Sequence, residues 1–278
     1  MRDRRGRSLS VGGAEVYLEE GGSGDVCAVF EAGAGAGRTL WDPVTAQLDG
    51  SVHTVAYDRV GRGRSKRAGS PQGIDEMAAT LVALIEAIRP NRLILVAHSM
   101  GGLVVRRAVD GLATPLAGLV LVDPTPELAP FYDDWSPTVR KTDRALAVQQ
   151  WLARSRPVMR KLTGSYGRLF AADTYAAMLA EDFSPAGIAQ TRNELRAVAA
   201  AIAEFRSRPP QLPDCPVTVL SATRAARLHA RNHDAVREYQ RRYAEQVNGQ
   251  FEDADSEHIV PAERPEQVAA AILRLARL

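Results

Sequence analysis

Five apolar runs rich in Val, Ile and Leu recur along the chain, and they constrain its fold more than any other feature. Because the runs are continuous rather than alternating, they are typical of strands that are covered on both faces. The segments between them are long enough for helices, so the sequence predicts α/β alternation and a mainly parallel sheet. The runs are VCAVF at 26–30, VHTVAY at 52–57, LILVA at 93–97, AGLVLV at 117–122 and PVTVL at 216–220.

The N-terminal segment has a different pattern. SLSV and AEVYLEE flank Gly12-Gly13, and this arrangement predicts a β-hairpin whose turn requires positive φ. We therefore expect an antiparallel hairpin at the start of the sheet and helices on both of its faces. Helical periodicity is clear at 74–89, 100–113, 229–247 and 263–278.

One long segment, residues 124–213, interrupts the alternation because it contains no convincing strand. We interpret it as a helical cap inserted before the penultimate strand, while residues 1–123 and 214–278 form the α/β core. Prolines divide the cap into helical stretches at 137–155, 172–181 and 185–206.

Length and charge exclude several classes of protein. The chain has 278 residues, of which 45% are hydrophobic, which is enough for the buried core of a folded protein. Its 35 Lys and Arg residues nearly balance 33 Asp and Glu residues, so we expect no basic stripe for nucleic acid. Because neither a secretory signal nor a membrane-spanning run is present, we expect a cytoplasmic protein with a small-molecule substrate and no membrane partner.

Cysteine and arginine usage indicate no special site. Cys27 and Cys215 lack CxxC spacing, which argues against a disulfide or a metal site; Cys27 lies inside an apolar run and Cys215 precedes one. Lys occurs only at 66, 141 and 161, so nearly all basic residues are Arg, and we interpret this as a compositional bias. No metal is expected.

The run at 93–97 leads directly into His98-Ser99 and two glycines. A Ser between an apolar strand and a helix, with Ala97 and Gly101 two residues to either side, fits a sharp turn that allows only minimal flanking side chains. The following helix would direct its unpaired N–H groups toward the same point, which suits a developing oxyanion. Ser99 is therefore the candidate nucleophile.

At these residues the sequence resembles the α/β-hydrolase superfamily, whose nucleophile motif is Gly-x-Ser-x-Gly, here with Ala97 in the place of the first Gly. The resemblance implies the fold of that superfamily, a Ser-His-acid catalytic triad and no cofactor. Three further segments carry it: EAGAGAG at 31–37, in the position of an oxyanion loop, DRVGRGRS at 58–65, and EHIVPAERPEQVAAAI at 257–272 around the catalytic His.

A Ser hydroxyl needs a base within hydrogen-bond reach and a third group that orients the base. His258 is the best base, because the resemblance implies a His between the last strand and the last helix. The remaining histidines are weaker candidates, namely His53, His98, His229 and His233.

The acid is harder to assign. Most relatives carry it in the loop after the PVTVL strand, but here that loop contains Arg224 and no carboxylate. A variant arrangement places the acid after the strand before the cap, and Asp123 lies there. Asp123 is therefore the expected acid, with three fallbacks, Asp234, Asp253 and Asp255.

The resemblance assigns the oxyanion hole to the backbone N–H groups of Ala34 and Met100. Most relatives have His-Gly where this chain has Ala32-Gly33, so an imidazole that would stabilise the loop is missing. A phosphate-binding loop is the alternative interpretation of GAGAG. That segment lacks the Lys-Ser/Thr ending of a P-loop and the final Gly of a dinucleotide fingerprint, which favours the oxyanion loop.

The cap holds most of the aromatic side chains, and Tyr132 and Trp135, which are near Asp123 in sequence, are expected to line the substrate pocket.

The leading hypothesis is a metal-free serine hydrolase for a carboxylic ester, or a related acyl compound, of a small apolar molecule. Two alternatives remain open. One is a lyase or cyclase, or a C–C or thioester-cleaving enzyme, on the same triad, and the other is a non-catalytic receptor for a small ligand.

Overall fold

An eight-stranded sheet with the order β1-β2-β4-β3-β5-β6-β7-β8 forms the centre of the molecule. The computed structural model describes residues 5–48, 50–225 and 230–278. All pairings from β4 to β8 are parallel, which confirms the predicted mainly parallel sheet. The strands are β1 (Arg5–Val11), β2 (Ala14–Gly21), β3 (Val26–Glu31), β4 (His53–Tyr57), β5 (Arg92–His98), β6 (Leu116–Val122), β7 (Val217–Ala222) and β8 (Gln250–Ala254).

The predicted hairpin is confirmed as the antiparallel edge of this sheet. β1 pairs with β2, with Val11 opposite Ala14, and β2 pairs antiparallel with β4. Gly12 and Gly13 form the turn with φ of 56° and 80°, a region that glycine enters without a steric penalty.

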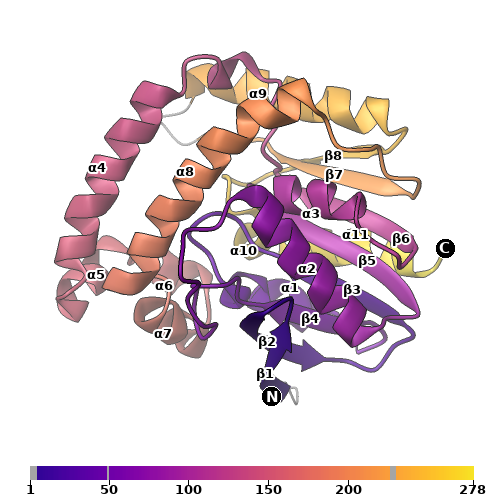
Figure 1. Cartoon of the computed structure of the whole chain (residues 1–278), viewed down its shortest axis with the longest axis horizontal. Helices are drawn as coiled ribbons and strands as arrows, with labels where there is room; N and C mark the ends of the chain where they lie inside the picture. Colours follow the sequence, from indigo (N-terminus) through magenta and orange to yellow (C-terminus); the bar gives the residue numbers. More distant parts are fainter. Residues whose placement is uncertain (1–4, 49, 226–229) are drawn as a thin grey trace.

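Helices cover both faces of the sheet (Figure 1). Side chains from successive strand residues enter opposite cores, so that Leu95 belongs to one and Val96 to the other. This double burial explains the continuous apolar runs. One face carries α2 (Ile74–Ile88), α3 (Gly101–Val109) and α9 (Ala230–Gln246); the other carries α1 (Asp42–Gln47), α10 (Val260–Glu263) and α11 (Pro265–Ala276), with the 3-10 helix η1 (Arg38–Trp41) before α1.

Helix α3 ends at Val109, before the expected end at residue 113. The physical reason is a tight turn, because the N–H of Gly111 donates to the carbonyl oxygen of Ala108 at 2.9 Å and the α-helical pattern stops there.

The chain between β6 and β7 is helical, as predicted, and we call residues 124–213 the insertion. The sequence interpretation took prolines as breaks and therefore missed α5 (Arg156–Leu162), because Pro157 stands in the first turn of this helix, where proline is tolerated. The division of the chain into a core and a cap domain stays a prediction. The insertion contains the 3-10 helix η2 (Pro130–Tyr132), two long helices side by side, α4 (Ser136–Leu152) and α8 (Pro185–Ser207), and three shorter ones, α5 (Arg156–Leu162), α6 (Tyr166–Leu169) and α7 (Ala172–Ala180) (Figure 1).

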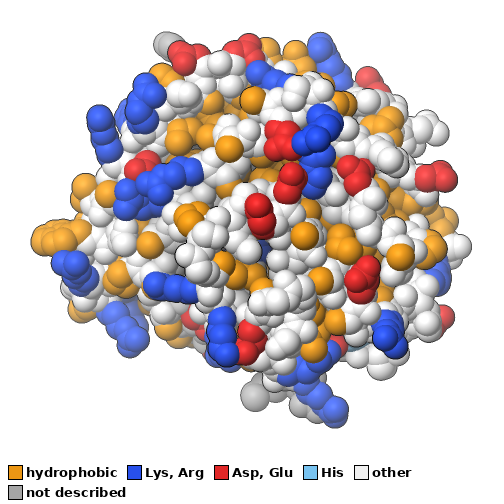
Figure 2. Space-filling view, in the orientation of Figure 1, with side chains coloured by type: hydrophobic (Ala, Val, Ile, Leu, Met, Phe, Trp, Pro, Cys, Tyr) orange, Lys and Arg blue, Asp and Glu red, His pale blue; other side chains and the backbone are white. Residues whose placement is uncertain are grey.

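Basic and acidic side chains are interspersed over the face seen in Figure 2. Three of the arginines, Arg38, Arg59 and Arg62, are 2%, 4% and 0% exposed and pair with buried carboxylates. A buried arginine needs such a partner, and the partners come from distant parts of the sequence. Within the described part of the chain, no helix combines the length and apolarity that crossing a membrane requires.

Candidate active site

Loops at the carboxyl edge of the sheet carry the predicted nucleophile, base and acid. Ser99 follows β5, Asp123 follows the neighbouring strand β6, and His258 follows β8. Because parallel strands end at the same edge of a sheet, residues far apart in the sequence converge there. The structure brings all three side chains together.

Ser99 lies in the sharp turn between β5 and α3, in a strained backbone conformation. Its φ of 54° is in the left-handed region, which residues other than glycine rarely adopt. A Cβ atom on Gly101 would lie 2.6 Å from the carbonyl oxygen of Glu31, and Ala97 is completely buried. Both flanks of the turn therefore need minimal side chains, as the motif predicted.

Hydrogen bonds join the three side chains in an unbroken line. His258 Nε2 lies 2.9 Å from Ser99 Oγ, and His258 Nδ1 lies 2.6 Å from Asp123 Oδ2. Because an ionised carboxylate can only accept, Nδ1 carries the proton and Nε2 presents its lone pair to the hydroxyl. An imidazole in this tautomer can accept the hydroxyl proton when the oxygen attacks an electrophile.

The electrostatics of the site favour this arrangement at neutral pH. Burial raises the pKa of Asp123, but its interactions with His258 and with the amide of Gln240 outweigh burial and lower that pKa, so the carboxylate stays ionised. Burial lowers the pKa of His258, and the hydrogen bond and charge of Asp123 outweigh it and raise the pKa above 6.5. The imidazole is 61% exposed, which leaves the ring accessible to a substrate.

Gln240 of α9 holds the carboxylate of Asp123, and the sequence did not reveal it. Its amide nitrogen donates to Asp123 Oδ1 at 3.0 Å and to the carbonyl oxygen of Pro124 at 2.8 Å, while its amide oxygen accepts from Ser221 Oγ at 2.6 Å. Gln240 is 1% exposed on a helix of mostly polar residues. A single sequence contains no signal that separates this inward-facing amide from the solvated ones.

The weaker sequence candidates make other contacts. His98 Nε2 donates to the carbonyl oxygen of His258 at 2.8 Å, and burial lowers the pKa of His98 to about 3, so this ring stays neutral. His229 lies outside the described residues. The remaining histidine and acid candidates pair elsewhere: His53 with Glu20, Asp253 with Arg237, Asp255 with Arg224 and Arg264, and Asp234 with His233.

The assignment of the oxyanion hole to the backbone N–H groups of Ala34 and Met100 stays a prediction. Ala34, in the loop after β3, and Met100, the residue after Ser99, line the same cavity as Ser99 and His258. Among the contacts of the described residues, neither N–H donates a hydrogen bond. Both are therefore available to an oxygen atom of a ligand.

The cavity at Ser99 has a volume of about 460 Å³. Tyr132 and Trp135 line it as predicted, with their ring centroids 5.0 Å apart in an edge-to-face arrangement, and Phe131 packs against Tyr132. A second cavity, of about 660 Å³, shares Ala34, Glu257 and His258 with the first. In residues 5–48, 50–225 and 230–278, no group of three or more His, Cys, Asp or Glu side chains is arranged to hold a metal ion.

Comparisons with known proteins give relatives for parts of the sequence. RutD of Azorhizobium caulinodans, which is named for carbamate hydrolysis, is 31% identical over 93 residues, 34% of this chain and 35% of that protein. The 2-hydroxy-6-oxo-2,4-heptadienoate hydrolase of Pseudomonas putida is 33% identical over 101 residues, 35% of this chain and 36% of that protein. The matches thus span about a third of the length of these curated relatives.

Whole-chain comparisons identify the fold and the family. The crystal structure of ALR0039 from Nostoc sp PCC 7120 superimposes with a TM-score of 0.78 at 20% identity, over 98% of both chains. The sequence model of the alpha/beta hydrolase family matches residues 28–271. This match includes the loops that carry Ala34, Ser99, Asp123 and His258, and the chain belongs to the alpha/beta hydrolase family.

Proposed function

We propose that the protein is a serine hydrolase that cleaves a carboxylic ester, or a related acyl compound, of a small apolar molecule. The observation that carries the proposal is the hydrogen-bonded line from Asp123 through His258 to Ser99, with spacings of 2.6 Å and 2.9 Å. Membership of a hydrolase family supports the same reaction class.

The proposed reaction proceeds through an acyl-enzyme. Ser99 Oγ attacks the carbonyl carbon while His258 Nε2 takes the hydroxyl proton, and the carbonyl electron pair moves to the oxygen, which the N–H groups of Ala34 and Met100 stabilise. The oxyanion collapses, and His258 gives its proton to the departing alcohol. A water molecule, deprotonated by His258, then releases the acid, and Asp123 holds the imidazole throughout.

The proposed substrate class follows from the cavity beside Ser99. Its wall includes the rings of Phe131, Tyr132 and Trp135, and pockets of this size and character bind apolar or ring-bearing groups with a few polar anchors. We further propose that the insertion is a cap that supplies these rings, and that Tyr132 and Trp135 contact the acyl group of the substrate.

A fluorophosphonate probe tests the nucleophile. We expect stoichiometric labelling of the folded protein at Ser99, detected by intact-protein and peptide mass spectrometry, and no labelling of Ser99→Ala. Absence of labelling in the folded wild-type protein would contradict the proposal and favour the non-catalytic receptor.

A panel of p-nitrophenyl esters of increasing acyl length tests the reaction and the size of the acyl group. Because relatives are named for carbamate and oxo-dienoate substrates, an aryl carbamate and a vinylogous 1,5-diketone belong in the same panel. Labelling of Ser99 together with no ester turnover would contradict ester hydrolysis and favour the lyase or cyclase alternative.

A further inference from the structure

The loop that carries the Ala34 N–H has no polar side chain of its own. Residues 32–36 read AGAGA, and Gly35 has a φ of 84°, a conformation that the neighbouring alanines rarely adopt. A donor stabilises an oxyanion only if it is oriented before charge develops. Within the loop, the N–H of Ala36 donates to the carbonyl oxygen of Gly33 at 3.3 Å, and the side-chain support of the loop comes from other parts of the chain.

Arg59, in the turn after β4, binds the carbonyl groups of the loop. Its guanidinium donates to the carbonyl oxygen of Ala32 at 2.6 Å, to that of Gly33 at 2.8 Å, and to the carboxylate of Glu31 at 2.6 Å. The Gly33 carbonyl and the Ala34 N–H belong to one planar trans peptide and point in opposite directions. A fixed Gly33 oxygen therefore fixes the direction of the Ala34 N–H.

Glu194, from α8 of the insertion, binds the next peptide of the same loop. Its Oε2 accepts from the N–H of Gly35 at 2.9 Å, and its Oε1 accepts from Arg59 Nη2 at 3.1 Å. Burial raises the pKa of this fully buried carboxyl, but the charges of Arg59 and Arg62 outweigh burial and lower it to about 2. Ala34 thus lies between two peptides that are each held by one member of an ionised pair.

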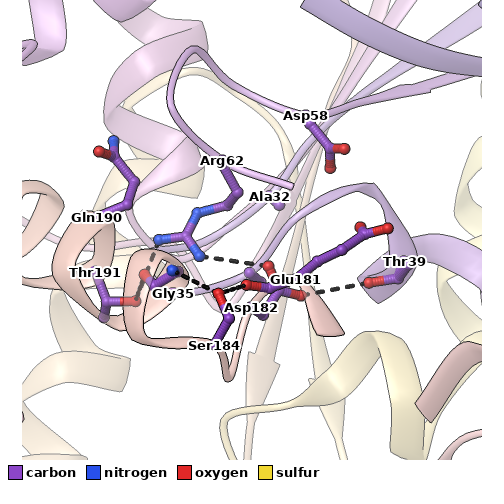
Figure 3. Close-up of polar contacts among 12 residues, drawn as sticks. Ala32, Gly35, Thr39, Asp58, Arg62, Glu181, Asp182, Ser184, Gln190 and Thr191 are labelled. Carbon is purple, nitrogen blue, oxygen red and sulfur yellow. Dashed lines mark hydrogen bonds and ion pairs between the residues drawn. The ribbon is translucent and has the colours of Figure 1, made fainter. Parts of the chain in front are cut away.

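Arg62, also in the turn after β4, binds side chains of α8 and the carboxylate of Asp182 (Figure 3). Its guanidinium lies between Thr191 and Asp182, to which it donates at 3.2 Å and 3.3 Å, and it also donates to Glu194 at 2.7 Å. These contacts keep the carboxylate of Glu194 in place against the loop. The support of the loop therefore comes partly from the insertion.

We propose that Arg59 and Glu194 are positioning residues for acyl transfer: Arg59 aims the Ala34 N–H at the oxyanion, and Glu194 holds both Arg59 and the loop. The inference rests on the proposed hydrolase function. Lysine cannot replace Arg59, because a single ammonium does not reproduce the planar fork that reaches Ala32 and Gly33 together. Arg59 therefore stabilises the loop in place of the imidazole that this sequence lacks at position 32.

Arg59→Lys is the test, with p-nitrophenyl butyrate as the substrate. We expect kcat to fall about 10- to 100-fold while KM stays within about threefold, because a misdirected N–H donor costs less rate than the complete removal of that donor.

The second readout compares an alkyl trifluoromethyl ketone, which Ser99 converts to a tetrahedral oxyanion, with the matching methyl ketone, which stays a ketone. In Arg59→Lys, the inhibition constant of the trifluoromethyl ketone should rise by the factor by which kcat for the ester falls. The inhibition constant of the methyl ketone should stay unchanged.

Arg38→Lys is the matched control. Arg38 is buried like Arg59 and pairs with Asp58 and with Glu181 of the insertion, but the described structure shows no hydrogen bond from Arg38 to residues 32–36. We expect this variant to keep the wild-type ratio of the two ketone inhibition constants. Thermal unfolding of both variants measures the general cost of the Arg-to-Lys change.

An equal loss of kcat in both variants, or a change in KM alone for Arg59→Lys, would overturn the positioning role. If Arg59→Lys does not fold, Glu194→Gln decides the question with the same two ketones, and an unchanged ratio of their inhibition constants would overturn the proposal. A wild-type protein that hydrolyses no ester and does not prefer the trifluoromethyl ketone would overturn the proposed function itself, which is a separate result.

Discussion

At Ser99 and Asp123 the backbone adopts the left-handed region, with φ of 54° and 44°. Side chains other than glycine pay a steric penalty there, and such strain persists only where the surroundings impose it. Both residues lie at the carboxyl ends of neighbouring parallel strands and belong to the hydrogen-bonded line with His258. At the scale of the residue, therefore, the proposed chemistry and the backbone strain coincide.

Replacement of Ser99 by glycine should stabilise the fold relative to replacement by alanine. Both changes remove the hydroxyl, but only glycine relieves the strain of a φ of 54°, which we expect to add about 1 kcal/mol to the free energy of unfolding. Urea denaturation of Ser99→Gly and Ser99→Ala measures the difference. Equal stability of the two variants would show that the turn is not strained.

The pH dependence of kcat/KM should report the protonation of His258. The base must be neutral, and Asp123 raises its pKa above 6.5, so activity should increase with pH through a midpoint above that value. Asp123→Asn removes the charge that raises the pKa, and its amide can donate to Nδ1, which leaves the imidazole in the wrong tautomer. We expect turnover to fall by about 10⁴ and the midpoint to move to lower pH; an unmoved midpoint would assign the acid elsewhere.

At the scale of the element, helix α9 supports the site from the face of the sheet on which it packs. Helix α9 packs on the core that contains Val217 and Val219 of β7, and its buried Gln240 reaches past β7 to Asp123. The helix thereby fixes one carboxylate oxygen, while the other accepts the hydrogen bond that His258 Nδ1 donates. The acid is held from two sides before a substrate arrives.

Gln240→Leu should weaken catalysis without removing any member of the hydrogen-bonded line. The change keeps the side chain buried but takes away a donor to a charged oxygen, so we expect the pKa of Asp123 to rise and kcat to fall about tenfold. Gln246→Leu is the control, since Gln246 lies exposed on the same helix. Similar kcat values for the two variants would contradict a role of Gln240 in holding the acid.

At the scale of the whole molecule, the insertion is joined to the sheet by buried charges. Glu194 of α8 pairs with Arg59 and Arg62, at 3.1 Å and 2.7 Å, on the turn after β4. A buried pair of this kind gives little net stability over an apolar contact, but removal of one partner leaves an uncompensated charge. The attachment of the insertion should therefore depend on the ionisation of Glu194.

Glu194→Gln should destabilise the protein by about 3 kcal/mol at pH 7, because two arginines lose the charge that compensates them. The folded pKa of about 2 lies below the ordinary value of 4.5, so the stabilisation is complete above 4.5 and is lost as the pH falls towards 2. Denaturation at a series of pH values should show the wild-type and variant curves converging below 4.5. Parallel curves would contradict the ionised pair.

The sequence predicted those features that depend on local pattern. Continuous apolar runs identified the doubly covered strands, and the small residues around Ser99 identified the turn, because each pattern lies within a few neighbouring residues. Asp123 could be predicted because the resemblance implies a variant arrangement with the acid after the strand before the cap, and the chain offers no carboxylate in the alternative loop beside Arg224. The position of His258 followed from the resemblance to a known family.

The features that escaped prediction depend on distant partners. Arg59 and Glu194 are separated by 135 positions, and neither has a neighbour that marks it as buried. Gln240 lies among other polar residues of α9, and only the fold shows that its amide donates to Asp123. Composition therefore shows only the excess of arginine over lysine, whereas the three-dimensional structure shows buried ion pairs around the loop of Ala34.

Rapid-quench mass spectrometry with p-nitrophenyl acetate is the most direct test of the proposed chemistry. The account predicts a transient acetyl adduct, a mass increase of the intact protein that maps to the peptide of Ser99, formed at the rate of the nitrophenol burst and absent from Ser99→Ala. An acetyl group on another residue, or undiminished ester turnover by Ser99→Ala, would contradict it.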